Sequence, residues 1–402
     1  MAAIAGALAL AVAAVFFARA GEWAQALFLR FDRSWPWLTL LVTPAIFMGV
    51  VWATRRHWPL ARGSGIPQVM AAGHKPVSHR SAELLGLRTA AAKFAGTLLV
   101  LLAGGSAGRE GPTVQISAAV MVGVYRLLRV PLTAGVVIAG GAAGVAAAFN
   151  TPLAGVAFAI EELAAAFEQK VAVLVMAVVM LAGLVSLGLS GDYVYFGALN
   201  TGLDVRTMLV AAPLAGVAGG ISGALFSRAL IGIAWSRADW LSPIRAHPVY
   251  FAGLCGLVVA TTGLASGGLS WGTGYETTRA LLQGEHTSLV FGPAKFIATL
   301  ATSLSGAPGG IFAPSLSVGA GLGQLLGFLF APQKAGAIVL LGVVGYFTGV
   351  VRAPLTAVII VMEMSADRGM ILPLFGTALI ADWISAMICR PKLYHALSLQ
   401  FR

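Results

Sequence analysis

Apolar residues in this chain occur in long segments, and polar residues are concentrated in the connections between them. Long apolar stretches recur, each close to the roughly 20 residues that a helix needs to cross the hydrocarbon of a bilayer. They are residues 36–54, 132–149, 171–190, 208–226, 248–265, 336–351 and 370–389. Other apolar runs are shorter and are interrupted by glycine or proline. Because irregular backbone at membrane depth must be satisfied by protein or water, the pattern predicts an all-α polytopic membrane protein with tilted, partly re-entrant helices.

Composition and charge support a place in lipid. Of the 402 residues, 58% are hydrophobic and 10% are charged, which leaves too few polar groups to cover a soluble globule. The net charge of +11 raises the question of nucleic acid, but the basic residues, Arg55 and Arg80 among them, cluster in polar connections. Cationic loops beside anionic lipid explain this pattern better, so no nucleic-acid partner is expected. Residues 1–20 lack the positive start of a signal peptide, which favours a retained first membrane segment.

An internal repeat organises the chain. Residues 93–163 align with residues 295–365 at an unbroken offset of 202, which pairs Lys93 with Lys295 and Glu161 with Glu363. The duplicated lysines could shape the field along a pathway, although a structural role is favoured, in which they snorkel or pair with a buried acid. We therefore expect two transmembrane halves, 1–200 and 201–402, with no separate soluble domain. The residues alone leave open whether the halves are parallel or inverted.

Three glycine-rich segments end in a proline where a new apolar run begins. This pattern is typical of a helix start, since proline is favoured in the first turn and glycine lets the backbone approach a ligand. A helix start exposes free N–H groups and the positive end of the helix dipole, which together attract an anion. Each segment alone could be a tight turn, but three in one duplicated chain favour anion binding. The segments are Gly63-Ser64-Gly65-Ile66-Pro67, Gly108-Arg109-Glu110-Gly111-Pro112 and Gly309-Gly310-Ile311-Phe312-Ala313-Pro314.

In these three segments, and from about residue 36 to the C-terminus, the chain resembles the CLC family of chloride channels and proton-coupled chloride transporters. The resemblance implies two inverted-topology halves and a homodimer with one pathway per subunit. It also implies that chloride is bound by the Ser64 hydroxyl, by the backbone N–H groups of Ile311 and Phe312, and by the Tyr394 phenol. Serine at position 64 goes with a preference for chloride in that family. Without the resemblance, Tyr394 would be interpreted as a residue of the interfacial aromatic belt.

Glu110 is an acid at a helix start that points into the membrane. An ionisable side chain is costly there and is a candidate for function. When ionised, its carboxylate can occupy the site of an anion, and when protonated it loses the charge that held it there. The resemblance assigns Glu110 the role of gate. The structural alternative is a helix-capping acid paired with Arg109.

Glu162 has no acidic counterpart in the second half, where Met364 takes its place, whereas Glu161 is matched by Glu363. The duplication suggests that Glu161 bonds to nearby backbone. The resemblance makes Glu162 an internal proton-transfer acid, so the chain is expected to be a secondary transporter that exchanges chloride for protons. The alternative is a passive, voltage- or pH-gated chloride channel of the same fold.

Other function classes find little support in the residues. The expected spans carry no Ser/His pair, His-Glu-x-x-His motif or paired aspartates, so an enzyme is not expected. We expect no cofactor and no metal, only chloride, protons and the lipid bilayer as partners. Because the sequence ends at Arg402, shortly after Tyr394, we expect no cytoplasmic regulatory domains. The resemblance points to a multi-pass protein of the bacterial inner membrane, and stretches 171–190 and 370–389 are the candidate dimer surface.

Overall fold

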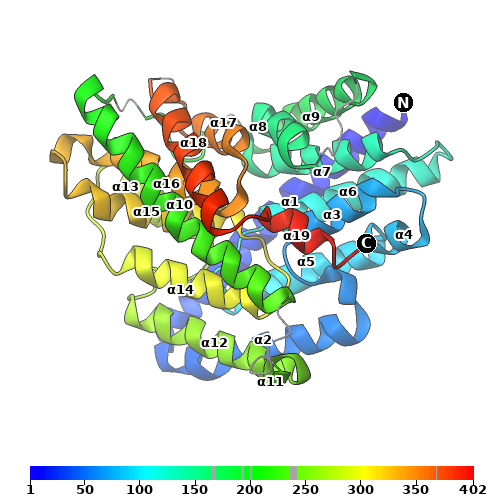
Figure 1. The fold of residues 1–402 in the computed structure, drawn as a ribbon. Helices are drawn as coiled ribbons and strands as arrows, with labels where there is room; N and C mark the ends of the chain where they lie inside the picture. The colour runs from blue at the N-terminus through cyan, green and yellow to red at the C-terminus, as the bar shows by residue number, and fades with distance from the viewer. Residues whose placement is uncertain (164–168, 192–193, 200–201, 236–241, 368) are drawn as a thin grey trace.

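The computed structural model is an assembly of helices packed around one another in several layers (Figure 1). It describes residues 1–163, 169–191, 194–199, 202–235, 242–367 and 369–402. Within these ranges the chain forms no β-strand, only one isolated bridge between Gly108 and Gly310. The prediction of an all-α fold is confirmed. The boundary predicted between residues 200 and 201 lies outside the described residues.

The helices range from 5 residues in α11 to 33 residues in α1. They are α1 (Ala2–Ser34), α2 (Thr39–His57), α3 (Ile66–His74), α4 (His79–Leu84), α5 (Leu87–Leu102), α6 (Glu110–Leu127), α7 (Ala134–Phe149), α8 (Pro152–Phe158), α9 (Gln169–Ser190), α10 (Val205–Trp235), α11 (Ser242–Ala246), α12 (Pro248–Ala265), α13 (Tyr275–Leu282), α14 (Phe291–Leu304), α15 (Phe312–Gly327), α16 (Ala335–Val351), α17 (Pro354–Ser365), α18 (Ile371–Ile388) and α19 (Leu393–Ser398). Short 3-10 turns are η1 (Pro36–Leu38), η2 (Pro59–Ala61) and η5 (Pro332–Lys334), and η3 (Ala159–Leu163) is a π-helical turn that continues α8.

Seven helices of the described chain are long and apolar enough to cross a membrane. Six of them coincide with predicted apolar stretches, and the seventh is α1, in line with a retained first segment. The stretch 132–149 differs from the prediction: it forms α7, which has only 16 residues and is buried along almost its whole length. Because protein surrounds α7 on all sides, its apolar character reflects packing inside the protein rather than contact with lipid.

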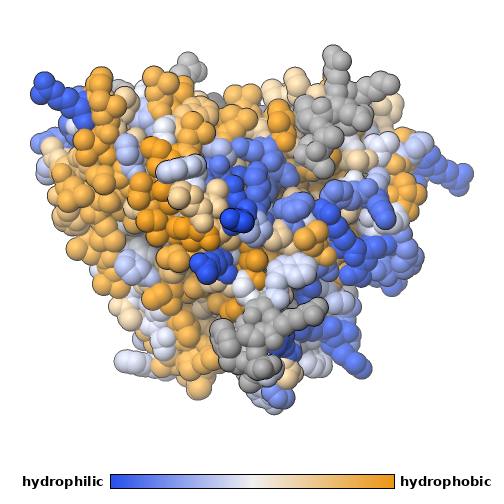
Figure 2. Space-filling view, in the orientation of Figure 1, coloured by the Kyte–Doolittle hydropathy of each residue, from blue (hydrophilic) through white to orange (hydrophobic). Residues whose placement is uncertain are grey.

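In contrast to α7, the long helices expose large apolar side chains on the outer surface of the protein. Figure 2 shows apolar surface over the face where α10 and α18 lie in Figure 1. Soluble proteins rarely expose apolar patches of this extent, whereas a surface placed within a membrane, against lipid or against another subunit, carries them. The chain is an integral, multi-pass membrane protein. The exposed side chains are Val205, Leu209, Val210, Leu214, Val217, Ile221 and Leu225 on α10 and Leu372, Leu379, Trp383 and Met387 on α18.

The two repeats meet at a point where each copy contacts its own equivalent. The backbone N–H of Gly108 donates to the carbonyl of Gly310 at 2.7 Å, and the N–H of Gly310 donates to the carbonyl of Gly108 at 2.7 Å. These two residues are equivalent at the offset of 202, so the pair bonds as it would across a twofold axis. The helix starts of α6 and α15 are thereby held side by side.

Glu161 and Glu363 form a second reciprocal contact between the repeats. The Glu161 carboxylate accepts from the N–H groups of Leu355 (3.2 Å) and Thr356 (2.7 Å), at the start of α17. The Glu363 carboxylate accepts from the equivalent groups of Leu153 (3.1 Å) and Ala154 (2.7 Å), at the start of α8. Each acid caps a helix of the other half. The expectation that Glu161 bonds to backbone is confirmed.

We predict that Glu161→Ala and Glu363→Ala each destabilise the protein by about 1–2 kcal/mol, because each leaves two N–H groups of a helix start without an acceptor. The midpoint of heat-induced loss of the monodisperse gel-filtration peak in detergent should fall by roughly 2 °C or more. Glu285→Ala, which removes an exposed acid from a connection, is the control and should leave the midpoint unchanged. Equal midpoints for all three variants would contradict this account.

Candidate anion pathway

Four helices begin in the interior of the protein with no side-chain cap from the described residues. Three of them, α3, α6 and α15, are the helix starts that the sequence predicts, and their N-caps are Gly65, Arg109 and Ile311. The fourth is α13, whose N-cap is Gly274. An uncapped helix start leaves backbone N–H groups free for a ligand and adds the positive end of the helix dipole. The interior is thus suited to an anion.

The duplicated lysines hold two of these helix starts in place. Lys93 Nζ donates to the carbonyls of Gly63 (2.7 Å) and Arg62 (3.1 Å), just before α3. Lys295 Nζ donates to the carbonyls of Gly272 (2.6 Å) and Ser270 (3.0 Å), just before α13. Both lysines are fully buried. Binding the carbonyls turns the adjoining N–H groups the other way. The role is structural, but the lysines bind backbone carbonyls and neither snorkel nor form an ion pair with an acid among the described residues.

The structure brings together Ser64, Ile311, Phe312 and Tyr394, which come from three distant parts of the sequence. Ser64, Ile311 and Tyr394 line one cavity of about 280 Å³, and the Ser64 and Tyr394 hydroxyls lie close to each other. Neither hydroxyl makes a regular hydrogen bond within the described chain, so both remain free to donate to an anion. Tyr394 is 0% exposed, which rules out a place in the interfacial belt.

Gly111 and the aromatic ring of Phe312 shape this site. A Cβ atom on Gly111 would lie 2.4 Å from Ser64 Oγ, so only glycine leaves the hydroxyl its space. The Phe312 ring lies 6.0 Å from the Tyr394 ring and 4.9 Å from the Phe347 ring, centroid to centroid. The Phe312 side chain, at the start of α15, therefore forms an apolar wall next to Tyr394. We call the cavity that opens from this site the inner cavity.

Basic side chains stand around the inner cavity. Arg55, Arg62 and Arg245 line it together with Ser64 and Tyr394. A cleft lined by one sign of charge raises the local concentration of the opposite ion. The positive charge of these three arginines therefore attracts anions into the inner cavity.

Glu110 is 1% exposed and its carboxyl group lies at the start of α15. Its Oε1 accepts a hydrogen bond from the Tyr275 hydroxyl at 2.9 Å. The carboxyl also lies next to the backbone N–H of Ala313, and a Cβ atom on Gly108 would come within 2.2 Å of Oε2. The acid of the first half thus occupies a position at the helix start of the second half where an anion would be stabilised.

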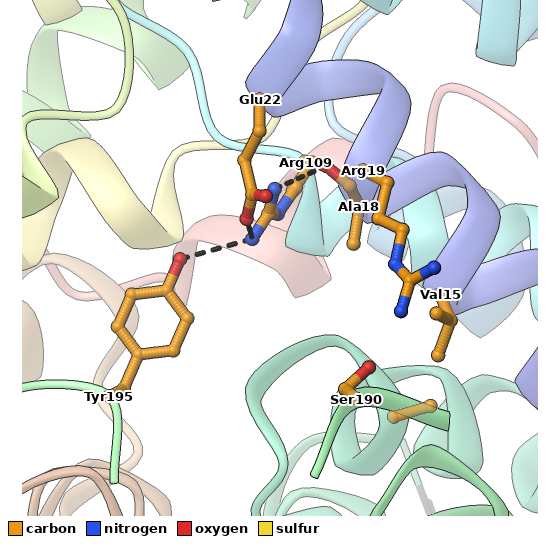
Figure 3. A pocket seen from close by; sticks show the side chains of 8 residues that line it. Val15, Ala18, Arg19, Glu22, Arg109, Ser190 and Tyr195 are labelled. Atoms are coloured by element: carbon orange, nitrogen blue, oxygen red, sulfur yellow. Dashed lines mark hydrogen bonds and ion pairs between the residues drawn. The ribbon is translucent and has the colours of Figure 1, made fainter. Parts of the chain in front are cut away.

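Arg109 turns away from this carboxyl group. Its guanidinium donates to the Glu22 carboxylate at 2.8 Å and to the Tyr195 hydroxyl at 3.0 Å (Figure 3). Its other nitrogen donates to the carbonyl of Ala18 on α1. The alternative in which Glu110 is paired with Arg109 is therefore wrong: the ion-pair partner of Arg109 is Glu22.

Two cavities meet around Arg109, Glu22 and Tyr195. One of about 310 Å³ is also lined by Arg19 and Ser190, and the other, of about 380 Å³, extends to Thr273, Tyr275, Glu276 and Arg279. We call the second the outer cavity. Tyr275 lines the outer cavity and bonds Glu110, whereas Gly111, next in sequence, packs on Ser64 of the inner cavity. Glu110 therefore lies between the two cavities.

Glu162 lies in the π-helical turn η3 and is 5% exposed. Neighbouring side chains on a helical turn point in different directions, and here Glu161 reaches α17 while Glu162 is buried. Neither Glu162 oxygen has a hydrogen-bond partner among the described residues. The positive charges nearest to it belong to Lys392 and Arg352, and Tyr394 lies in the neighbourhood of both Glu162 and Glu110 without a hydrogen bond to either. Glu162 and Glu110 thus share Tyr394 as a neighbour.

Sequence reasoning missed Tyr275, Tyr195 and Glu22. A signal for Tyr275 exists, because Gly272-Thr273-Gly274 repeats the pattern of Gly63-Ser64-Gly65. The offset there is 209 rather than 202, so a comparison without gaps does not detect it. Glu22 and Tyr195 are an ordinary helical acid and an ordinary loop aromatic in sequence. No group of three or more His, Cys, Asp or Glu side chains in the described ranges is placed to hold a metal ion.

Known proteins share this architecture. Residues 45–386 match the family described as voltage gated chloride channel. A protein of Yersinia pestis bv. Antiqua (strain Angola) named H(+)/Cl(-) exchange transporter ClcA is 32% identical over 390 residues, which cover 90% of this chain and 77% of that protein. The crystal structure of a slow cyanobacterial Cl-/H+ antiporter superposes with a TM-score of 0.82 at 25% identity, covering 99% of this chain and 96% of that chain.

A CLC-type fluoride/proton antiporter has the same fold, with a TM-score of 0.82 at 21% identity and with 99% of this chain and 96% of that chain covered. The family match spans most of the sequence and includes the helix starts of α3, α6 and α15, which are gathered around one buried acid. The relationship therefore holds for the sequence and the fold, and this chain belongs to the voltage gated chloride channel (CLC) family.

Proposed function

We propose that this protein exchanges chloride for protons across the membrane, with Glu110 as the gating carboxylate and Glu162 as the internal proton-transfer acid. The observation that carries the proposal is the position of the Glu110 carboxyl group at the start of α15, between the inner and outer cavities. The names of the Yersinia relative and of the cyanobacterial neighbour, an H(+)/Cl(-) exchange transporter and a Cl-/H+ antiporter, support it.

Chloride would be bound by neutral donors: the hydroxyls of Ser64 and Tyr394 and the backbone N–H groups of Ile311 and Phe312. The two hydroxyls are buried and have no regular hydrogen bond among the described side chains, as a site for an exchangeable ion requires. Partial charges attract an anion without holding it as tightly as a lysine would. They therefore suit a site that must bind and release an ion in every cycle.

Coupling would follow from competition for one position. While ionised, Glu110 occupies the start of α15 and excludes chloride from it. When it takes up a proton, it loses the charge that favoured that position, so the side chain can leave and chloride can enter. One protonation event is thereby linked to one step of anion movement.

Glu162 would deliver protons from the side of the inner cavity. Its carboxyl group is buried and makes no ion pair among the described residues, the positive charges of Lys392 and Arg352 act on it from a distance, and Tyr394 lies in the neighbourhood of both acids. A buried acid without bonded partners is costly unless it serves a function. The second half carries Met364 at the equivalent position, so the proton route would exist only once.

The protein would act as a homodimer in the bacterial inner membrane, with α9 and α18 as the contact surface. Both helices expose apolar side chains at helical spacing. On α9 these are Val173, Met176, Met180 and Leu184, and on α18 they are Leu372, Leu379, Trp383 and Met387.

We predict that Glu110→Gln abolishes proton coupling and the pH dependence of chloride flux while chloride still passes, because glutamine is neutral at every pH. Chloride efflux and proton uptake measured together in proteoliposomes test this. Glu276→Gln, which neutralises an exposed acid at the outer cavity, is the matched control and should keep both activities. Proton-coupled, pH-dependent exchange by the Glu110 variant would overturn the proposed function.

We predict that Glu162→Gln keeps chloride flux but reduces proton uptake by at least ten-fold, because the internal step of the proton route is lost. Glu161→Gln is the neighbouring control and should retain coupling, since Glu161 bonds backbone groups of α17. Undiminished proton uptake by Glu162→Gln would remove this residue from the mechanism. Chloride flux without proton movement in the unmodified protein would instead favour the passive channel.

A further inference from the structure

The Tyr275 hydroxyl donates a hydrogen bond of 2.9 Å to Glu110 Oε1. The donor and the acceptor are 165 positions apart in the sequence, and both side chains are buried. A hydrogen bond to a charged group in a site screened from water is stronger than one between neutral groups. The contact therefore favours the ionised, seated form of Glu110 over the protonated form, which bears no charge.

Several neighbours hold the first residue of α13 in place. Gly274 has φ +80°, and a Cβ atom there would lie 2.7 Å from Ser317 Oγ, so the backbone can turn into the helix only at a glycine. The hydroxyl and the N–H of Thr273 both donate to Gln25 Oε1 on α1, at 3.2 and 3.1 Å. One turn into the helix, the hydroxyls of Thr278 and Ser317 bond at 2.9 Å.

A second ring sets the direction of the Tyr275 side chain. The Tyr195 ring packs on it with centroids 4.4 Å apart, and the Tyr195 hydroxyl accepts from Arg109. Arg109 is in turn paired with Glu22. The position of the Tyr275 hydroxyl thus depends on fixed contacts on three sides, and little ordering is needed when Glu110 returns to it.

The contact occurs only once in the duplicated chain. Lys93 and Lys295 hold equivalent loops, so α13 corresponds to α3 and Gly272-Thr273-Gly274 corresponds to Gly63-Ser64-Gly65. On this correspondence Tyr275 is the counterpart of Ile66, which has no polar side-chain atom. The first half uses its loop to present Ser64 to the inner cavity, and the second half uses the matching loop to present a phenol to the gate.

We propose that Tyr275 is a positioning residue that latches Glu110 in the closed position by donating a hydrogen bond to its carboxylate. The inference rests on the proposed role of Glu110 and extends it to a residue outside the chloride-binding set. Opening would then require that the carboxyl group take up a proton and give up this bond. Tyr275 would therefore set the pH at which the gate opens.

The charged and titratable groups near Glu110 come from three directions, although the Arg109 side chain points away from its carboxyl group. Arg109 precedes it at the start of α6, Tyr275 contacts it from α13, and Tyr394 interacts with it from α19. Behind Arg109 stands Glu22 on α1. Of these groups, the Tyr275 hydroxyl has the side-chain hydrogen bond to the carboxylate, so it can be removed without a change of formal charge.

The test is the pH dependence of chloride efflux from proteoliposomes for wild type, Tyr275→Phe, Tyr195→Phe, Glu110→Gln and Glu110→Gln/Tyr275→Phe. Tyr275→Phe keeps the ring and loses the donor. We expect its half-maximal flux at a pH about one unit higher, a ten-fold change in proton concentration, because the ionised form loses its latch. If Tyr275→Phe does not fold, Tyr275→Ile takes its place and must show the same shift, because isoleucine is the residue at the equivalent position 66 of the first half.

The outcomes separate the latch from the function on which it rests. An additional shift caused by Tyr275→Phe in the Glu110→Gln background would overturn the latch, since no carboxylate remains to be held. An unchanged profile for Tyr275→Phe beside a flat profile for Glu110→Gln would also overturn the latch, but it would leave the proposed function standing. Tyr195→Phe keeps the ring that packs on Tyr275 and the Tyr275–Glu110 bond, and it loses only the hydroxyl bonded to Arg109, so a shift of equal size in this variant would assign the effect to the field of the outer cavity and contradict the latch.

Discussion

The structure depends on a single constraint, the need to satisfy backbone N–H groups where helices begin inside a membrane protein. Four helices start in the interior without a side-chain cap among the described residues. Buried donors without partners are costly, so such a site persists only where an acceptor is supplied. The Glu110 carboxyl group lies at the start of α15, and in the proposed function a chloride ion competes with it for that position. The proposed pathway would therefore be built from the termini of helices rather than from charged side chains.

Duplication of the chain accounts for this arrangement, because equivalent residues of the two repeats make the same contacts. Gly108 and Gly310 bond each other reciprocally, Glu161 and Glu363 cap helices of the opposite half, and two lysines hold equivalent loops. The repeats differ at the positions proposed to act. Glu110 is opposite Phe312, and Glu162 is opposite Met364. A symmetric scaffold thus carries an asymmetric set of acids, which is what a directional proton route requires.

Much of the fold and part of the site could be predicted from local patterns. Apolar stretches of membrane length depend only on composition, and a Gly-rich segment before a proline marks a helix start wherever it occurs. The constant offset of 202 likewise needs no three-dimensional information. Ser64, Ile311 and Phe312 belong to such segments. Tyr394 does not, and only the family resemblance pointed to it, because a tyrosine near the end of an apolar chain is equally compatible with the lipid interface.

The sequence by itself therefore determined the fold class, the duplication and the acids in question. Only the tertiary structure decided which groups meet those acids. Arg109 is next to Glu110 in sequence yet pairs with Glu22, while the phenol on Glu110 comes from Tyr275, 165 positions away. The physical reason is that a side-chain contact depends on how distant helices pack, and the spacing of residues along one segment carries no information about that packing.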